Sequence, residues 1–241
     1  MLGLPSLSST PGRGARTGCP ISATGSADSI FVHDPSFLTG NGAVLLRPGK
    51  SHRRCEVEEH ATLYRELDLP VLGRLVEPAR AEGGDLLWLD ETTLAVGLGF
   101  RTNAEGLRQI AETLRPAGVE VFAVPLPWHT GPEACLHLMS LVSMVDRDLA
   151  VGFRPLLPVA FLERLDRAGV TFVEVPEVEF ETQGPNVLAV APRDCILLEE
   201  NAETARRLER AGCRVRTYRG DEISHNAEGG PTCLTRALLR E

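Results

Sequence analysis

The chain has 241 residues, of which 43% are hydrophobic and 24% are charged, and its formal net charge at pH 7 is −8. A chain of this length and composition can bury roughly 70% of its unfolded surface and form one large or two small domains. The acidic balance argues against nucleic acid or an anionic membrane as a partner, although it allows a small cationic substrate. No apolar run approaches the ~20 residues of a membrane span, and the first residues lack a secretory apolar region. We therefore expect a cytoplasmic protein.

The cysteines point to the same compartment. Six of them are scattered singly along the chain, and none forms a Cys-x-x-Cys pair. This spacing favours reduced thiols over a disulfide framework or a zinc site.

Residues 1–27 are rich in Gly, Ser, Thr and Pro and have no periodic apolar face, so they are predicted to form an irregular tail. A first strand is predicted at 30–32, ending at 33–35. The remainder, residues 28–241, is expected to form one domain.

A repeated unit occupies most of that domain. Each copy reads apolar strand, polar connection, amphipathic helix and second apolar strand. The first strands begin at residues 42, 94, 149 and 195. The helices are predicted near 56–67, 104–114, 159–168 and 201–211. Extra strands fit at 85–89 and 186–190, which makes each copy a ββαβ-like unit, and the segments at residue 30 and at the C-terminus are left to contribute to a fifth.

Three architectures are compatible with this alternation. A doubly wound sheet usually carries a phosphate loop after its first strand, but the segment 97–102 has Thr102 where the third glycine belongs. A (β/α)₈ barrel needs more repeats than the chain contains. A ring of ββαβ units fits best, and it would gather the polar ends of strands from several units into one cleft.

A cysteine after a Gly-Gly-Pro turn, Cys233, is the first candidate for chemistry. Glycines allow a turn that other residues cannot adopt, and such a turn can present one side chain to a ligand. Taken singly, Cys233 is more often a buried small hydrophobe, and His137 is more often a core histidine. Several other polar residues at predicted strand ends favour a catalytic role for both of them. They are Asp34, Arg53, Arg54, Glu82, Asp85 and Arg101.

Six motifs in order carry a family resemblance. They are FVHD, LLRPGKSHRR, EGGD, VGLGFRTN, CLHLMSLVSM and GGPTCLTR. With them the chain resembles the guanidino-group-modifying superfamily, most closely the dimethylarginine dimethylaminohydrolase and amidinotransferase family, from about Asp28 to Arg240. The resemblance implies the pentein fold, an α/β propeller of about five ββαβ units with pseudo-fivefold symmetry around a central active-site cleft. It also implies that residues 28–241 form a catalytic domain.

The resemblance assigns roles to seven residues. Cys233 matches the nucleophile, His137 the general acid/base, Glu82 its acidic partner, Asp34 a carboxylate that grips the guanidinium, Arg53 and Arg101 the ligands of the substrate α-carboxylate, and Asp28 the ligand of its α-amino group. The implied reaction converts dimethylarginine to citrulline and dimethylamine. No cofactor or metal is implied, and a homodimer is allowed.

These residue types suit that chemistry. The guanidinium carbon is a poor electrophile because its charge is delocalised, so a thiolate is the most suitable nucleophile. Carboxylates pair with a planar guanidinium through parallel hydrogen bonds, and a histidine can protonate the leaving amine and then deprotonate water. Two arginines suit the carboxylate of a free amino acid.

The chain departs from the family pattern at two positions. His33 stands where dimethylarginine hydrolases usually have an acidic residue, which leaves open whether the substrate is methylated arginine, arginine or another guanidino compound. Met139 stands where arginine deiminases carry an aspartate. The family's usual N-terminal strand and lid also have no clear counterpart in residues 1–27. The alternatives are an amidinotransferase, an arginine deiminase and a non-catalytic pentein that binds a partner.

Overall fold

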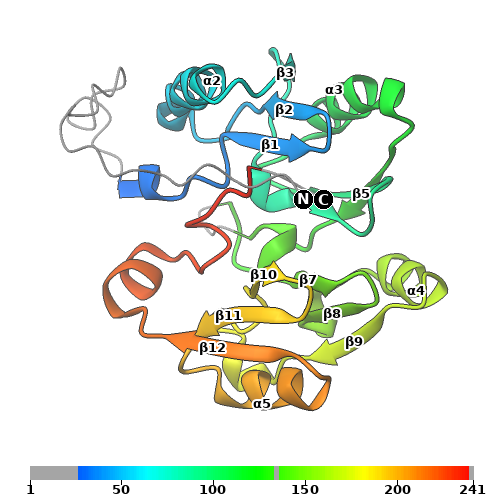
Figure 1. The fold of residues 1–241 in the computed structure, drawn as a ribbon, viewed down its shortest axis with the longest axis vertical. Coiled ribbons are helices and arrows are strands. Elements are labelled where there is room, and N and C mark those ends of the chain that lie inside the picture. Colours follow the sequence, from blue (N-terminus) through cyan, green and yellow to red (C-terminus); the bar gives the residue numbers. More distant parts are fainter. Residues whose placement is uncertain (1–26, 133–135, 239–241) are drawn as a thin grey trace, which may run out of the picture.

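A computed structural model describes residues 27–132 and 136–238, which form four units of three strands and one helix (Figure 1). The first unit contains β1 (Ser36–Thr39), β2 (Gly42–Leu45), α2 (Glu56–Glu66) and β3 (Val71–Arg74). The second contains β4 (Leu86–Trp88), β5 (Thr93–Leu98), α3 (Ala104–Leu114) and β6 (Glu120–Pro125). The third contains β7 (Val142–Asp146), β8 (Leu149–Gly152), α4 (Val159–Arg167) and β9 (Thr171–Glu174). The fourth contains β10 (Leu188–Ala191), β11 (Asp194–Leu198), α5 (Ala202–Arg210) and β12 (Arg214–Tyr218).

Every unit has the same topology. Its first two strands pair antiparallel, and the third strand returns after the helix to pair parallel with the second. The predicted ββαβ repeat is therefore confirmed. Helix α3 illustrates why the sequence pattern worked: Asn103 caps it by accepting from the Gly106 N–H at 2.8 Å, and its Ile110 and Leu114 are buried.

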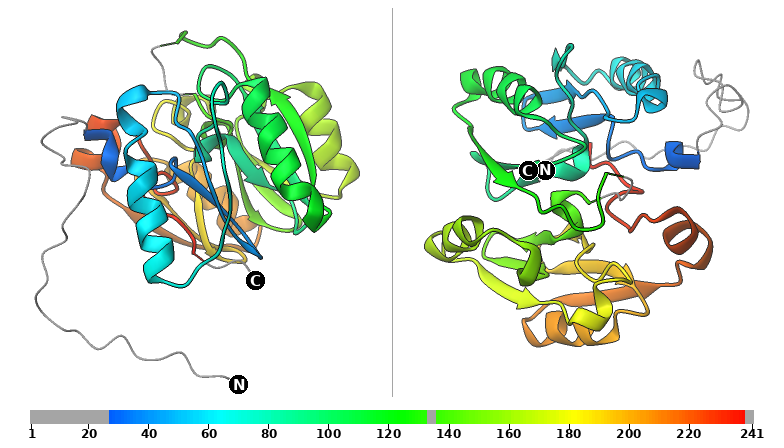
Figure 2. Two further views of the ribbon diagram at one scale, coloured as in Figure 1. Left: turned by 90° about the horizontal axis from the view of Figure 1, so that it is seen from above. Right: turned by 180° about the vertical axis from the view of Figure 1, so that it is seen from behind.

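The units pack side by side through their central strands. In β5, Leu94 and Val96 face the first unit, whereas Ala95 between them faces the third. In β8, Ala150 faces the second unit and Leu149 faces the fourth. Because side chains alternate along a strand, each of these two strands is buried on both faces by its neighbours. The helices lie on the outside of the assembly (Figures 1 and 2).

The first predicted strand, at 30–32, is wrong. The segment instead forms a short 3₁₀ turn, η1 (Ala27–Ile30), followed by a bend in which Phe31 N–H donates to the Asp28 carbonyl at 2.9 Å. The buried Phe31 ring packs against the backbone of Gly229, so tertiary packing and not sheet pairing explains its apolar character.

The segments outside the four units meet each other. The His33 N–H donates to the Cys233 carbonyl at 3.2 Å, and the pictures place the segment that follows β12 beside the one that precedes β1 (Figures 1 and 2). Neither segment contains a strand within 27–132 and 136–238. The fifth unit and the pseudo-fivefold ring thus stay predictions, and the predicted tail lies almost entirely outside the described residues.

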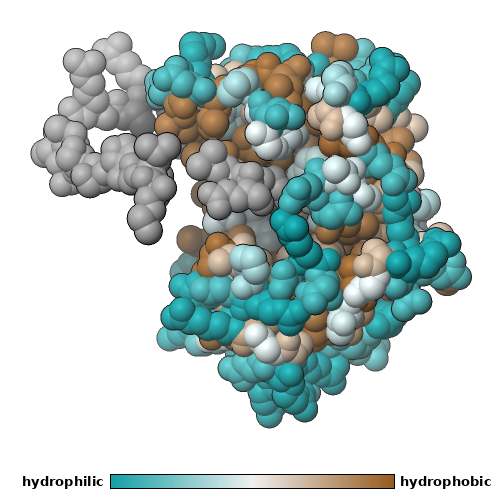
Figure 3. All heavy atoms as spheres, turned by 45° about the vertical axis from the view of Figure 1, so that its right-hand side comes forward, coloured by the Kyte–Doolittle hydropathy of each residue, from teal (hydrophilic) through white to brown (hydrophobic). Residues whose placement is uncertain are grey.

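The surface and the cysteines add two observations. In the part of the chain that the structure describes, no helix is both long and apolar enough to cross a membrane. Hydrophilic residues cover much of the face drawn in Figure 3, with hydrophobic atoms in patches between them. Cys195, Cys213 and Cys233 carry free thiols, but the half-buried Cys55 is disulfide-bonded, so the expectation of reduced thiols throughout is wrong.

Candidate active site

One cavity collects all seven residues to which the sequence assigned a role. It lies where the first three units meet the segments at 27–34 and 227–233. Its lining consists of Asp28, Phe31, Asp34, Lys50, Arg53, Glu82, Arg101, His137, Ala227, Glu228, Gly229 and Cys233.

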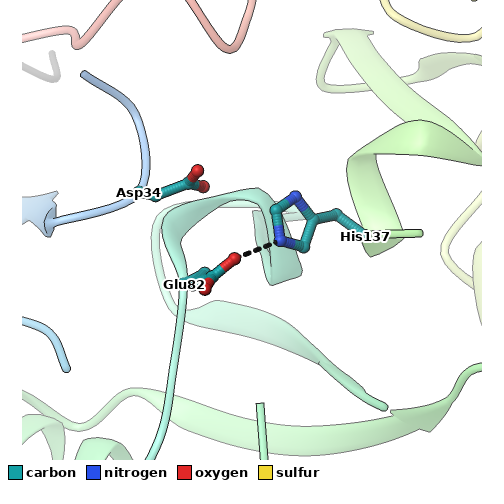
Figure 4. A group of neighbouring side chains, drawn as sticks. All are labelled: Asp34, Glu82 and His137. Atoms are coloured by element: carbon teal, nitrogen blue, oxygen red, sulfur yellow. Dashed lines mark hydrogen bonds and ion pairs between the residues drawn. The ribbon is translucent and has the colours of Figure 1, made fainter. Parts of the chain in front are cut away.

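Glu82 and His137 form the centre of the site (Figure 4). The Glu82 carboxylate lies 2.8 Å from His137 Nε2, and both side chains are buried. Burial alone would raise the pKa of Glu82, but the hydrogen bond and charge of His137 outweigh it and the pKa is lowered. An ionised carboxylate only accepts hydrogen bonds, so Nε2 carries a proton and Nδ1 is the nitrogen that exchanges one.

The two glycines of Glu82-Gly-Gly-Asp85 allow this arrangement. A Cβ atom on Gly84 would lie 2.3 Å from His137 Nδ1, and one on Gly83 would lie 2.0 Å from the His33 carbonyl oxygen. The imidazole therefore rests directly on bare backbone, a contact that only glycine permits.

Asp34 enters the same centre from the loop before β1, and its carboxylate faces His137 (Figure 4). Its oxygens accept from Arg53 Nη1 at 2.7 Å and from the Gly84 N–H at 3.2 Å. Burial would raise the pKa of Asp34, but the charges of His137 and Arg53 hold it at about 2. Asp34 is thus a fixed carboxylate at neutral pH.

Arg53 uses most of its donors within the protein. Besides Asp34, its guanidinium binds the Glu56 carboxylate through Nε and Nη2 and the Phe31 carbonyl at 2.8 Å. Of the five N–H groups of an arginine, this leaves one on Nη1. Arg53 therefore holds Asp34 in place, and its predicted contact with a substrate carboxylate stays a prediction.

A second buried carboxylate, Asp85, supports the turn that carries the histidine. Asp85 accepts from the Leu138 N–H at 3.0 Å and from Thr102 Oγ1 at 2.6 Å. Thr102 Oγ1 in turn accepts from the Glu82 N–H at 3.2 Å. Burial raises the pKa of Asp85 to about 6. This network links the backbones of Glu82 and His137, so it fixes their relative position.

Cys233 is held by a residue that the sequence reading missed. Asn186 Nδ2 donates to Cys233 Sγ at 3.4 Å, while its Oδ1 accepts from the N–H and the hydroxyl of Thr232 at 3.0 and 2.7 Å. A Cβ atom on Gly230 would lie 2.4 Å from the Asn186 side chain. Asn186 is the first residue of a predicted strand that follows Gly184-Pro185, and this turn sequence was its only signal.

His33 joins the cysteine segment to the Asp34 loop. Its Nδ1 lies 2.9 Å from the Thr235 carbonyl, and its own carbonyl accepts from Arg236. A carbonyl can only accept, so Nδ1 carries the proton of a neutral ring. Burial, with the charge of Arg236, lowers the pKa of His33 to about 3. His33, which departs from the family pattern, is therefore a neutral side chain that connects the cysteine segment to the Asp34 loop.

The cavity is also lined by Asp28, Lys50 and Arg101. Lys50 Nζ lies 2.5 Å from Asp28 Oδ2, and Arg101 Nη1 lies 3.6 Å from Glu82 Oε1. The Gly49 N–H donates to the same Glu82 oxygen at 2.8 Å, so the turn that carries Lys50 is attached to the catalytic candidate.

A metal could in principle use three of these side chains. Asp34, Glu82 and His137 offer ligand atoms within 4.8 Å of one another. However, the guanidinium of Arg53 already pairs with Asp34, and a divalent cation would be repelled there. The expectation of a metal-free and cofactor-free site stays a prediction.

The site holds a buried carboxylate–imidazole pair, a second carboxylate and a cysteine, as the resemblance to the guanidino-modifying, or pentein, superfamily implies. The family model described as arginine deiminase matches residues 24–161 and 155–240. The chain belongs to the arginine deiminase family.

Two curated relatives and one solved structure are similar to this chain. The chain is 31% identical to N(G),N(G)-dimethylarginine dimethylaminohydrolase of Streptomyces coelicolor, over 89% of this chain and 75% of the relative. It is 29% identical to the arginine deiminase of Listeria welshimeri over 88% of its own length, but it spans only 61% of that relative. A mutant dimethylarginine dimethylaminohydrolase (DDAH) of Pseudomonas aeruginosa, complexed with citrulline, matches with 27% identity and a TM-score of 0.71, over 86% of this chain and 75% of that structure.

Proposed function

We propose that the protein hydrolyses a guanidino C–N bond of an arginine-like free amino acid through a covalent thiouronium intermediate on Cys233. The observation that carries this proposal is the shared cavity of Cys233, His137, Glu82 and Asp34. A thiol, a general acid/base with a carboxylate partner and a separate fixed carboxylate are the groups that this reaction needs.

The reaction follows from the positions of these groups. The Cys233 thiolate attacks the guanidinium carbon and forms a C–S bond, while His137 gives its Nδ1 proton to the departing amine as the C–N bond breaks. Water then attacks the thiouronium carbon, and His137 takes up one of its protons. The C–S bond then breaks and the former water oxygen loses its second proton to solvent, which releases the neutral ureido product and the thiolate. Glu82 stabilises the imidazolium present before the first half-reaction and formed again in the second.

Asp34 orients the guanidinium. Its pKa of about 2 keeps it ionised, so it can accept N–H groups of a cationic substrate at any physiological pH. The bound cation also favours the thiolate form of Cys233 by charge. Substrate binding and activation of the nucleophile are thereby coupled.

The preferred substrate in this proposal is dimethylarginine, which gives citrulline and dimethylamine. The dimethylated nitrogen has no N–H group, so it needs no hydrogen-bond acceptor from the site. Met139 also stands where arginine deiminases carry an aspartate. Arginine, with ammonia as the second product, is the alternative substrate. The matching family model and the relative from Listeria welshimeri are both described as arginine deiminases.

The test is a citrulline assay on the purified chain with arginine, monomethylarginine and dimethylarginine. We expect one of them to yield a ureido product and Cys233→Ser to abolish it, with the fold verified by circular dichroism. Product from the Cys233→Ser protein would refute the proposal. A thiouronium adduct detected by mass would eliminate the non-catalytic alternative, and transfer of the amidine to added glycine would reveal an amidinotransferase. A cytoplasmic location and a homodimer stay predictions.

A further inference from the structure

Lys50 is the only lysine among the 25 basic residues of the chain, and it lines the cavity of the candidate active site. The other 24 are arginines. Lysine differs from arginine in carrying a compact charge on a flexible stem with three rotatable donors. The single lysine therefore puts a flexible cation where it can contact a ligand bound in the cavity.

The contacts of Lys50 place its ammonium beside a carboxylate of the cavity. Nζ lies 2.5 Å from Asp28 Oδ2, and the two side chains are 38% and 27% exposed. The pair is thus reachable from solvent and belongs to the wall of the cavity. Its partial exposure also means that it contributes little to stability and can be exchanged for other ionic contacts.

The backbone of Lys50 is fixed although its ammonium is not. The preceding residue, Gly49, donates its N–H to Glu82 Oε1 at 2.8 Å, and a Cβ atom on Gly49 would lie 3.3 Å from the Arg101 carbonyl oxygen. The side chain therefore starts next to the carboxylate that binds His137 and extends to Asp28.

One of the two arginines that the resemblance would use for the substrate carboxylate, Arg53, is largely occupied. Arg53 is 3% exposed and is bound to Asp34, to Glu56 and to the Phe31 carbonyl. A cation that pairs with two carboxylates has little charge to offer a third. The other cations that line the cavity are Arg101, 3.6 Å from Glu82, and Lys50, beside Asp28.

We propose that Lys50 determines specificity for α-amino acids by exchanging Asp28 for the substrate's α-carboxylate; this rests on the proposed function. In the free protein Lys50 and Asp28 pair with each other. A substrate with an ammonium and a carboxylate on one carbon replaces this pair by two: its ammonium binds Asp28 and its carboxylate binds Lys50. A guanidino amine without the carboxylate can displace Lys50 from Asp28 but gives it no new partner.

The kinetic test compares the turned-over substrate with its decarboxylated counterpart, agmatine for arginine or dimethylagmatine for dimethylarginine. We expect the ratio of kcat/KM between acid and amine to fall by about 10- to 100-fold in Lys50→Met, the loss of one charge-assisted hydrogen bond, mainly through KM. Lys50→Arg should restore part of the ratio. The exposed Arg147→Met removes an ion pair with Glu91, and neither residue lines the cavity, so it is the matched control.

The outcomes separate two failures. If the wild-type chain turns over neither substrate, the proposed function fails. If it is active and Lys50→Met leaves the acid-to-amine ratio unchanged, the role of Lys50 is refuted while the function stands.

A second readout does not depend on turnover. In the full chain with Cys233→Ser, an amine-acetylating reagent can modify one side chain only, Lys50, and peptide mass spectrometry reports its rate. Saturating arginine should slow acetylation at least tenfold, because the carboxylate covers Nζ, whereas agmatine should not slow it. Equal protection by both ligands, or by neither, would overturn the proposal.

Discussion

The connection formed by His33 yields a prediction that couples stability to pH. His33→Leu removes the donor to the Thr235 carbonyl and leaves this acceptor without its partner, which should lower the free energy of unfolding by about 1–3 kcal/mol at pH 8. His33→Asn places an amide N–H near the position of Nδ1, so it should retain most of that stability.

The contribution of His33 to the free energy of unfolding depends on pH, and its pKa gives the direction of that dependence. The pKa of His33 is lowered from 6.5 to about 3, chiefly by burial, so the unfolded chain binds a proton below pH 6.5 that the folded chain does not. The contribution of His33 is thus complete above pH 6.5 and is lost as the pH falls, by about 1.4 kcal/mol per unit. By pH 5 the wild-type advantage over His33→Leu should have shrunk by about 2 kcal/mol.

Urea denaturation of the three proteins at pH 8, 6.5 and 5 measures these differences. Alkylation of Cys233 by iodoacetamide at pH 8 reports whether the cysteine segment has moved, and it should change in His33→Leu more than in His33→Asn. A stability difference between wild type and His33→Leu that stays constant from pH 8 to 5 would refute the assignment of a half-buried, neutral His33.

Three further substitutions test the centre of the site. Glu82→Gln should lower kcat by about 10²- to 10⁴-fold, as assayed by citrulline formation, because His137 loses the carboxylate that stabilises its protonated form; unchanged kcat would contradict this role. Gly84→Ala should cost about 10²-fold in activity because its methyl group displaces the imidazole, whereas Gly40→Ala, which meets nothing within 4 Å, should be neutral. Burial raises the pKa of Asp85 from 3.8 to about 6, so the stability that its protonated form contributes is complete below pH 4 and is lost as the pH rises to about 6. Wild type should therefore lose up to about 3 kcal/mol relative to Asp85→Asn between pH 4 and 7 in urea titrations, and a pH-independent difference would argue against a buried carboxylate.

Periodicity predicted the repeat well because the helices and the second strands carry their own signals. Helix α3 was predicted with its observed bounds, since Asn103 caps it and an apolar face follows. Strands β1 and β7 were not predicted, because each has a buried serine that interrupts the apolar pattern. Ser36 bonds to Tyr64, and Ser143 donates to the Pro185 carbonyl at 2.7 Å, so their hydroxyl groups are satisfied only by the tertiary fold.

The site was predictable to the extent that residues sit in recognisable motifs. Cys233 and His137 each lie in such a motif, and the structure brings them to one cavity. The partners that fix them were harder to find: Asn186 contacts the cysteine from 47 positions away, and nothing in its neighbourhood marks that contact. The use of Arg53 as a tether for Asp34 likewise depends on side-chain geometry that a motif does not contain.

The contact between His33 and the cysteine segment also has a consequence for the order of events during synthesis. It joins residues 202 positions apart, and such distant pairings form late because the loop between them must first close. The carboxylates and the imidazole belong to units that emerge from the ribosome well before residue 233. In the proposed reaction, a nascent chain can thus assemble most of its pocket while it still lacks the nucleophile, and it becomes reactive only when the segment around Cys233 docks.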